Sequence, residues 1–235
     1  MKKLLVLPFL LLLLPSCDTL MGLAQAAGGG SLSTTEIVNG LKEALTQGTN
    51  KGTNLLAAHD GFFKNAAVKI LLPNEAQQVT RKLSEIGMGG LVDAAIEKMN
   101  RAAEEAAKSA GPIFVNAIKQ MTINDAKNIL MGSDNAATEY LRRTTSTNLY
   151  QAFQPTIKSA LNKVGATDAW NKVFTTYNQI PFVQKVNPNL DDHVTLKAID
   201  GVFYMIAKEE KAIRKDPVQR ATALLKKVFA AQDRK

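Results

Sequence analysis

Residues 89–110 read GGLVDAAIEKMNRAAEEAAKSA, and this stretch sets the fold class. Its apolar side chains recur every three or four positions, which is the spacing of one face of an α-helix. Many of them are alanines, so a second helix can pack closely against this face. The stretch therefore predicts a long helix inside a bundle. The apolar positions are Leu91, Val92, Ala95, Ile96, Met99, Ala102, Ala103 and Ala106.

The rest of the chain carries the start and stop signals of further helices. No run alternates with period two for long enough to predict a strand. We therefore expect an all-α fold, a single domain of about eight to ten helices over residues 33–235. Shorter helices are expected over 73–86 and 169–177. The capping signals stand at Ser33–Glu36, at Thr122–Asp125 and at Asp216-Pro217, the last predicted to start the final helix.

Two glycines interrupt the first predicted helix. Gly48 and Gly52 lie four residues apart in the segment that follows Ser33. Glycine weakens a helix, but it also removes the side chain that would keep another helix at a distance. The pair therefore predicts either a kink or a close helix contact at this point.

The composition excludes several classes of site. The chain has 235 residues, of which 46% are hydrophobic and 21% charged, as in an ordinary folded protein. A single cysteine excludes an internal disulfide framework and Cys-rich metal clusters. With only two histidines, the chain has few ligands for a His-based metal site. No nucleotide-binding loop, nucleophile elbow, metalloprotease helix or EF-hand loop occurs. We assign no catalytic residue, no metal and no cofactor, and a binding or structural role is favoured over catalysis.

The N-terminus has the pattern of a signal peptide. Lys2 and Lys3 precede an apolar run of 11 residues from Leu4 to Leu14, which is too short to span a bilayer. Leu14-Pro15-Ser16-Cys17 follows and looks like a lipobox, although Pro15 departs from its usual residues. We predict cleavage of residues 1–16 and lipidation of Cys17. The alternative is an ordinary signal peptide cleaved after Ala26 or Ala27, which would release a soluble periplasmic protein.

A short tether is expected to join the lipid to the domain. Residues 17–32 contain Ala26-Ala27-Gly28-Gly29-Gly30-Ser31, a composition typical of a flexible linker. Cleavage before Cys17 removes Lys2 and Lys3 and lowers the formal net charge from +8 to +6. This mild excess is compatible with anionic lipid headgroups and does not indicate a nucleic-acid partner. We expect the protein to lie on the periplasmic side of a bacterial membrane. Besides the membrane, it is expected to bind an envelope protein or a small ligand.

Short motifs along residues 34–230 carry a family resemblance. They are GLKEAL at 40–45, DGF at 60–62, ILLP at 70–73, MNRAAE at 99–104, DA at 125–126, ILMG at 129–132, ATEY at 137–140, FQP at 153–155 and EEKAIR at 209–214. Together they resemble a family of exported bacterial proteins classified only as a domain of unknown function. The resemblance implies a helical, exported domain, often with a signal peptide or lipid. It implies no activity and no catalytic residues.

Polar residues on the predicted helices are the candidate site. One interpretation is a structural network, in which Asn100, Arg101 and Glu104 pair within helix crossings and Glu210 pairs with Arg214 four residues later. The other is a polar cleft between helices that binds a small ligand or supports catalysis. Such a cleft would be lined by Asn100, Arg101, Glu104, Asp125, Tyr140, Glu210 and Arg214.

The end of the chain suggests a third kind of contact. The last predicted helix and the residues after it are basic, and they could meet an anionic envelope surface. The residues concerned are Lys226, Lys227, Arg234 and Lys235.

Overall fold

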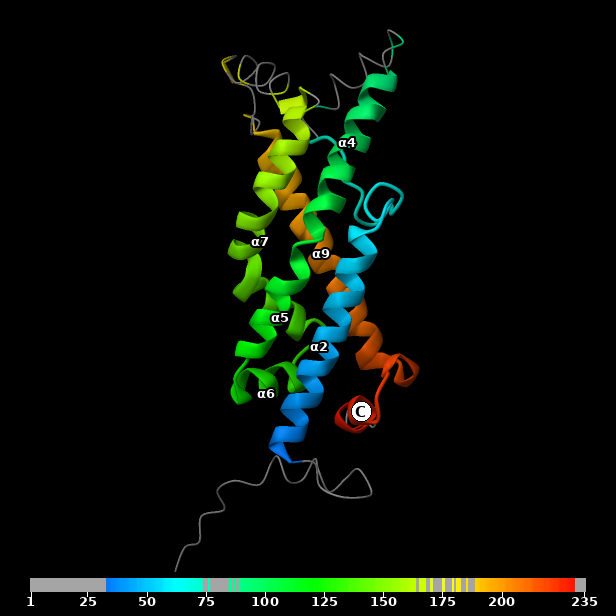
Figure 1. The fold of residues 1–235 in the computed structure, drawn as a ribbon, viewed down its shortest axis with the longest axis vertical. Coiled ribbons are helices and arrows are strands. Elements are labelled where there is room, and N and C mark those ends of the chain that lie inside the picture. The colour runs from blue at the N-terminus through cyan, green and yellow to red at the C-terminus, as the bar shows by residue number, and fades with distance from the viewer. Residues whose placement is uncertain are drawn as a thin grey trace, which may run out of the picture.

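The apolar stripe that begins at residue 89 forms a helix, α4 (Gly89–Ala107), in a computed structural model of the chain. A second helix, α5 (Ala110–Gln120), continues in the same direction (Figure 1). Pro112 lies in the first turn of α5, where a missing N–H removes no helical hydrogen bond. The break between the two helices therefore falls at residues 108–109. The structure describes residues 33–73, 76, 85, 87, 89–163, 165–167, 170, 175, 179, 181–182, 185 and 189–230.

Three further long helices run beside α4 and α5. They are α2 (Thr34–Ala57), α7 (Ala136–Lys163) and α9 (Leu190–Lys215). α2 packs on α9, α4 and α5, while α7 packs on α9, α4 and α5. Figure 1 shows the result as an elongated bundle whose four columns run alternately up and down.

Shorter helices close one end of the bundle. α6 (Ile123–Met131) packs on α2 and α7, and α10 (Ala223–Phe229) packs on α2. A 3₁₀ turn, η2 (Pro217–Gln219), joins α9 to α10. This end, the lower one in Figure 1, also contains the start of α2, and we call it the α6–α10 end.

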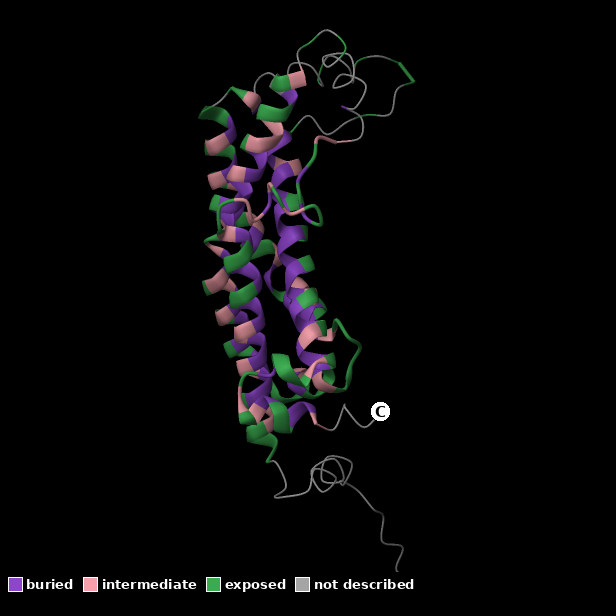
Figure 2. Cartoon of the chain, turned by 90° about the vertical axis from the view of Figure 1, so that its right-hand side faces the viewer, coloured by how far each residue is buried: buried purple, intermediate pink, exposed green. Residues whose placement is uncertain are grey.

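The core runs along the whole bundle, and Figure 2 shows the buried residues on the facing sides of the long helices. α7 contributes a fully buried stripe that includes Leu141, Leu149, Phe153 and Ile157. Successive members lie four or eight residues apart, so each lies close to the helix face of the one before it. Phe203 of α9 packs edge-on against a phenylalanine of α5, with ring centroids 5.9 Å apart.

The all-α prediction is confirmed, although the helix count differs. The described residues form seven α-helices and no strand, against the eight to ten helices expected. They include the long helix predicted from residue 89 and the helices predicted to follow the capping signals at Ser33 and Thr122. The helices expected over 73–86 and 169–177 fall mainly outside the described residues. Residues 1–32 also lie outside them, and so does Cys17.

A glycine brings two long helices close together. A Cβ atom on Gly52 would lie 3.5 Å from the backbone of α9 at Met205 and Ile206, and α2 continues through this point. Of the two outcomes predicted for the glycine pair, the structure has the close helix contact.

The end of α9 differs from the prediction. Asp216-Pro217 starts the short η2 turn and not the last helix, which begins at Ala223 with Thr222 as its N-cap. Arg220 lies between them and is 1% exposed. Its guanidinium donates hydrogen bonds to the carbonyls of Ile213 (3.0 Å) and Arg214 (2.9 Å), at the end of α9. These bonds satisfy carbonyls that the helix leaves unpaired, and they hold the chain in a turn where the sequence predicts a helix.

Candidate functional site

One group of the candidate residues fastens a loop to α4. Asn100 is completely buried in the α4 stripe. Its Oδ1 accepts a hydrogen bond from Ile70 N–H (2.8 Å), and its Nδ2 donates to the carbonyls of Ile70 (2.8 Å) and Ile96 (2.7 Å). One side chain thus satisfies both backbone groups of Ile70, as a neighbouring strand would.

The next turn of α4 holds the start of the same loop. Glu104 is buried, and its Oε1 accepts hydrogen bonds from the N–H groups of Phe62 and Phe63, both at 3.1 Å. Its Oε2 pairs with Arg101 Nη1 at 2.8 Å. Arg101 Nη2 in turn lies 2.7 Å from Asp60 Oδ1. The charges of Arg101 and Glu104 are therefore paired within the protein, and the loop that follows α2 is bound at each end.

The ion pairs shift the pKa values of this group. Lys64 and Arg101 donate to the carboxylate of Asp60 and lower its pKa from 3.8 to about 2. Glu104 and Asp60 raise the pKa of Arg101 by accepting its hydrogen bonds. Asp60 and Arg101 therefore both carry their charges throughout the neutral range, as an ion pair requires.

Acid should weaken this network in a predictable direction. Because the folded-state pKa of Asp60 lies below the unfolded value, the ionised group stabilises the fold above about pH 4, and that contribution disappears between about pH 4 and pH 2. We expect Asp60→Asn to lose less stability than the wild type over this interval. Urea unfolding at pH 5, 4, 3 and 2 measures the difference. Asp93→Asn, which removes an exposed carboxylate from α4, is the control. Equal losses in Asp60→Asn and the wild type would contradict the prediction.

The second group of candidate residues lies at the corner between α6 and α7. Glu210 of α9 accepts hydrogen bonds from the N–H groups of Ala137 (2.9 Å) and Thr138 (2.8 Å) and from the Thr138 hydroxyl (2.7 Å). Those N–H groups belong to the first turn of α7, which no helical carbonyl can satisfy. Glu210 therefore caps α7 from another helix, and its negative charge faces the positive end of that helix.

Arg214 completes this corner with the opposite charge. Its Nε donates to Glu210 Oε1 (2.9 Å), and its Nη2 donates to the carbonyl of Ile129 (2.7 Å) near the end of α6. A cation at the C-terminal end of a helix is favourable for the same electrostatic reason. The buried pair thus joins the end of α6 to the start of α7, and it carries no unpaired charge.

The last two candidates have local roles. Asp125 accepts hydrogen bonds from Thr122 N–H (3.0 Å) and the Thr122 hydroxyl (2.7 Å), and these bonds lower its pKa. This is the capping box that the sequence predicts for α6. Tyr140 donates a hydrogen bond to the carbonyl of Ala117 (3.4 Å), and burial raises its pKa.

The seven residues therefore belong to different levels of the bundle. Phe62, which binds Glu104, packs against Gly201 of α9, and Glu210 comes nine residues later. At a rise of 1.5 Å per residue, this is about 13 Å along α9. All seven side chains form hydrogen bonds within the protein. These bonds favour a structural network over a shared binding cleft.

A polar groove at the opposite end of the bundle was not among the sequence-based candidates. It lies between the second half of α7 and the start of α9 and has a volume of about 530 Å³. One signal for it is present in the sequence, because four polar side chains of α7 recur at intervals of four residues and so share a face. The residues that line the groove are Tyr150, Gln154, Lys158, Asn162, Thr167, Asn189, Asp191 and Asp192.

The network, the corner and the groove all fall in the part of the chain that matches a known family. The family model for "Protein of unknown function (DUF4197)" matches residues 31–230. The chain belongs to this family. The match begins just before α2 and ends just after α10, so the DUF4197 domain is the helical bundle. The resemblance over residues 34–230 is thereby confirmed as a match to a domain of unknown function.

The remaining comparisons add no named relative. No curated protein and no solved structure matches the chain. Within the described part of this DUF4197 member, no helix has the length and hydropathy needed to cross a bilayer. Among the same residues, no three His, Cys, Asp or Glu side chains are grouped as a metal site would need.

Proposed function

We propose that this DUF4197 protein is a membrane-tethered binding domain of the bacterial cell envelope, held by a lipid on Cys17. The observation that carries the proposal is the position of its one cysteine, directly after an apolar run of 11 residues and Pro15-Ser16. A cysteine with several acyl chains supplies the two or more membrane signals that stable anchoring requires. The bundle then faces the periplasm on a tether of about 15 residues.

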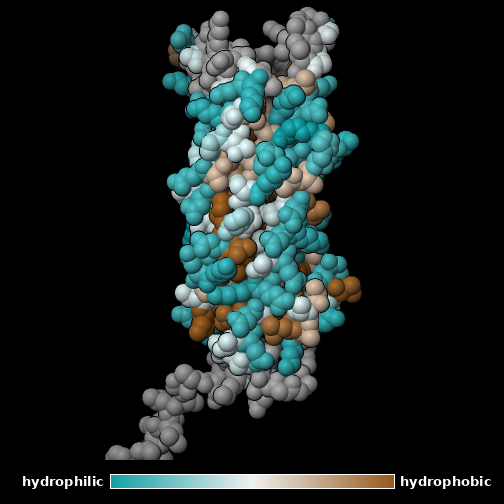
Figure 3. All heavy atoms as spheres, viewed as in Figure 1, coloured by the Kyte–Doolittle hydropathy of each residue, from teal (hydrophilic) through white to brown (hydrophobic). Residues whose placement is uncertain are grey.

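The surface of the α6–α10 end supports this orientation. α2 starts at this end, so residues 17–32 would connect it to the membrane. Ile123 and Met131 of α6 and Val218 of η2 are at least half exposed here. In the view of Figure 3, hydrophobic residues reach the surface in the lower half of the bundle. An apolar surface of this kind suits the interface of a bilayer.

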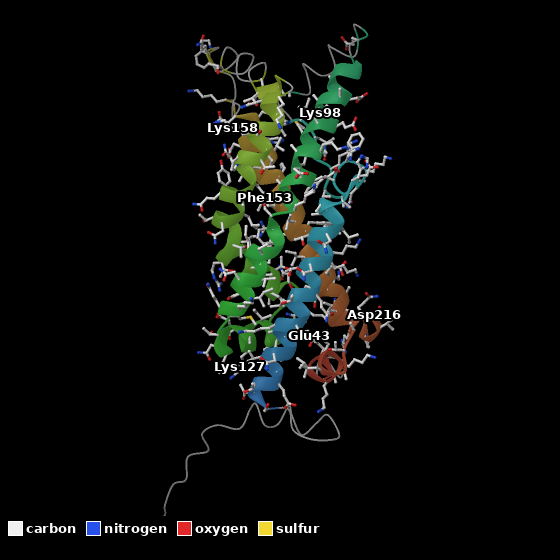
Figure 4. All side chains as sticks on the ribbon, viewed as in Figure 1. Glu43, Lys98, Lys127, Phe153, Lys158 and Asp216 are labelled. Carbon is white, nitrogen blue, oxygen red and sulfur yellow. The ribbon has the colours of Figure 1, made fainter. Side chains whose placement is uncertain are left out.

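Lysines add charge complementarity at the same end. Lys226 and Lys227 of α10 are exposed, and so is Lys127 of α6, which Figure 4 labels at the lower end of the bundle. Arg234 and Lys235 lie outside the described residues. Basic side chains within a Debye length of an anionic membrane attract it by about 1 kcal/mol each. We propose that these lysines orient the tethered domain against anionic headgroups.

Replacing the cysteine tests the tether. We expect Cys17→Ala to lose all metabolic labelling by an alkyne-bearing fatty acid and to move from the membrane to the soluble fraction. The physical reason is that the variant has no thiol to acylate. In-gel fluorescence after conjugation to a dye measures the label, and ultracentrifugation measures the location.

A second cysteine variant separates lipidation from nonspecific thiol acylation. The double variant Cys17→Ala/Ser31→Cys keeps one cysteine in the expected tether but outside the lipobox, and it should remain unlabelled. A wild-type protein that takes up no label would overturn the proposed lipidation. Label on the double variant would show that the lipobox is not what directs acylation.

A further inference from the structure

The polar groove between α7 and α9 is built from one face of each helix. Tyr150, Gln154, Lys158 and Asn162 follow one another at one-turn intervals along α7. Opposite them, Asp191 and Asp192 lie in the first turn of α9. Tyr150 Oη donates to Asp192 Oδ1 (2.8 Å), and Gln154 Nε2 donates to Asp191 Oδ2 (2.9 Å). Both carboxylates are therefore held in fixed positions against the wall formed by α7.

A buried hydroxyl on the groove lacks a partner. Thr167 lines the groove and is only 6% exposed, and its Oγ1 has no hydrogen-bond partner among the described residues. It is the one buried side-chain oxygen or nitrogen of the described residues in this state. An unsatisfied buried hydroxyl costs about 1–3 kcal/mol, so such groups are usually paired with protein, water or a ligand. The Oγ1 atom itself is covered in this structure, so a ligand in the groove can bond to it only when the Thr167 side chain turns towards the groove.

The negative charges of Asp191 and Asp192 are partly compensated by neighbouring groups of the protein. Each carboxylate accepts a hydrogen bond from a neutral donor, and both lie at the positive end of a 26-residue helix. Lys158 adds a positive charge on the facing helix. A cationic ligand would thus gain less here than at two unpaired carboxylates. What the groove offers is a dense set of hydrogen-bond donors and acceptors in a volume suited to a small molecule.

We propose that this groove binds a small hydroxyl-rich ligand, a monosaccharide or disaccharide. Each sugar hydroxyl donates and accepts one hydrogen bond, so a row of hydroxyls matches the alternation of carboxylate, amide, ammonium and hydroxyl groups along the walls. On binding, the Thr167 side chain turns towards the groove and its Oγ1 pairs with a ligand hydroxyl, while Asp191 accepts a hydrogen bond from another. The ring of Tyr150 provides a flat apolar surface against which a sugar ring can pack.

The groove lies far from the proposed membrane contact. α9 runs from the groove to the α6–α10 end, and its 26 residues span about 39 Å. Figure 4 shows Lys158 near the upper end of the bundle, while Lys127 and Asp216 lie near the lower end. A tethered domain would present the groove away from the bilayer. Ligand binding is nevertheless independent of the tether, so the failure of one proposal leaves the other standing.

Direct binding of saccharides tests the proposal. The probes are glucose, N-acetylglucosamine and cellobiose, with putrescine as a cationic probe, added to the full-length protein in a zwitterionic detergent without a sugar headgroup. Saturation-transfer NMR detects contact, and the emission of the single tryptophan, Trp170, reports binding because this residue lies three positions after Thr167 in the chain. We expect saturable binding of at least one saccharide and none of putrescine.

Thr167→Val is the decisive variant because it is isosteric and removes only the unpaired hydroxyl. We expect saccharide binding about five- to tenfold weaker, as for the loss of one hydrogen bond, with no fall in the urea midpoint. Lys158→Met, at an exposed position, should weaken binding by a similar factor. The matched control is Thr145→Val, whose buried hydroxyl donates to the carbonyl of Leu141 within α7 and which does not line the groove. Its saccharide affinity should equal that of the wild type.

Three results would overturn the proposal. The first is a protein that binds none of the three saccharides, and the second is binding of putrescine alone, which would make the aspartates a cation site. The third is saccharide binding that both Thr167→Val and Lys158→Met leave unchanged, which would place the ligand elsewhere on the protein.

Discussion

Replacing Glu210 by glutamine is expected to lower the free energy of unfolding by about 3–5 kcal/mol. The variant removes the negative charge that pairs with the buried Arg214 and faces the first turn of α7. The guanidinium then remains buried with no counter-charge, because its other acceptors are the carbonyls of Ile129 and Leu130 at the end of α6. In the variant, the amide nitrogen of glutamine, which is a donor, would also face one of the backbone N–H groups of Ala137 and Thr138 that now donate to Glu210. Urea unfolding followed by circular dichroism measures the loss.

The neighbouring residue gives a matched control. Glu209 is also buried, but its carboxylate pairs with Lys51 of α2 (2.8 Å), whose side chain is 55% exposed. Water can therefore solvate that lysine when the pair is broken. We expect Glu209→Gln to cost about 1 kcal/mol or less, as for other solvent-exposed ion pairs. Equal losses in the two variants would show that capping of α7 by Glu210 contributes little.

Replacing Asn100 by leucine is expected to lower the free energy of unfolding by about 2–4 kcal/mol. The two side chains are similar in size, so the change removes hydrogen bonds without leaving a large cavity. Ile70 N–H and its carbonyl lose their partner in a buried position. Hydrogen exchange should show the loss locally, with the amide of Ile70 exchanging faster than in the wild type.

Lys98→Leu serves as the control for this variant. It introduces the same side chain at an exposed position of α4, two residues away. Surface substitutions of this kind usually change stability by less than about 0.5 kcal/mol. If Asn100→Leu unfolded at the wild-type urea concentration with Ile70 still protected, the loop would be held by its apolar contacts and not by Asn100.

Local signals in the sequence were sufficient for most of the helices. The capping boxes at Ser33–Glu36 and Thr122–Asp125 are both present, with side-chain and backbone bonds in both directions. Each depends on residues three positions apart, and the nearest neighbours along the chain decide such a pattern. The i, i+4 pair of Glu210 and Arg214 was predictable for the same reason.

The partners of those polar residues were not predictable from spacing. Glu210 accepts from residues 72 and 73 positions earlier, and Arg214 donates to residues 84 and 85 positions earlier. Arg220 was missed because its acceptors become available only where α9 ends, and the sequence places a helix at that point. The same holds for the groove, since Tyr150 and Asp192 are 42 residues apart.

The sequence alone therefore determined that the chain is helical, which face of the helix that begins at residue 89 is apolar, and that the protein belongs to a family of unknown function. These properties depend on a periodicity of 3.6 residues and on caps a few residues long, both of which are local. The tertiary structure alone decided that Glu104 binds the loop after α2, that Glu210 caps α7, and that Thr167 lies buried beside a polar groove. Those outcomes depend on which helices become neighbours. A buried carboxylate or hydroxyl takes whatever donor or acceptor the packing brings within about 3 Å, and no spacing along the chain encodes that choice.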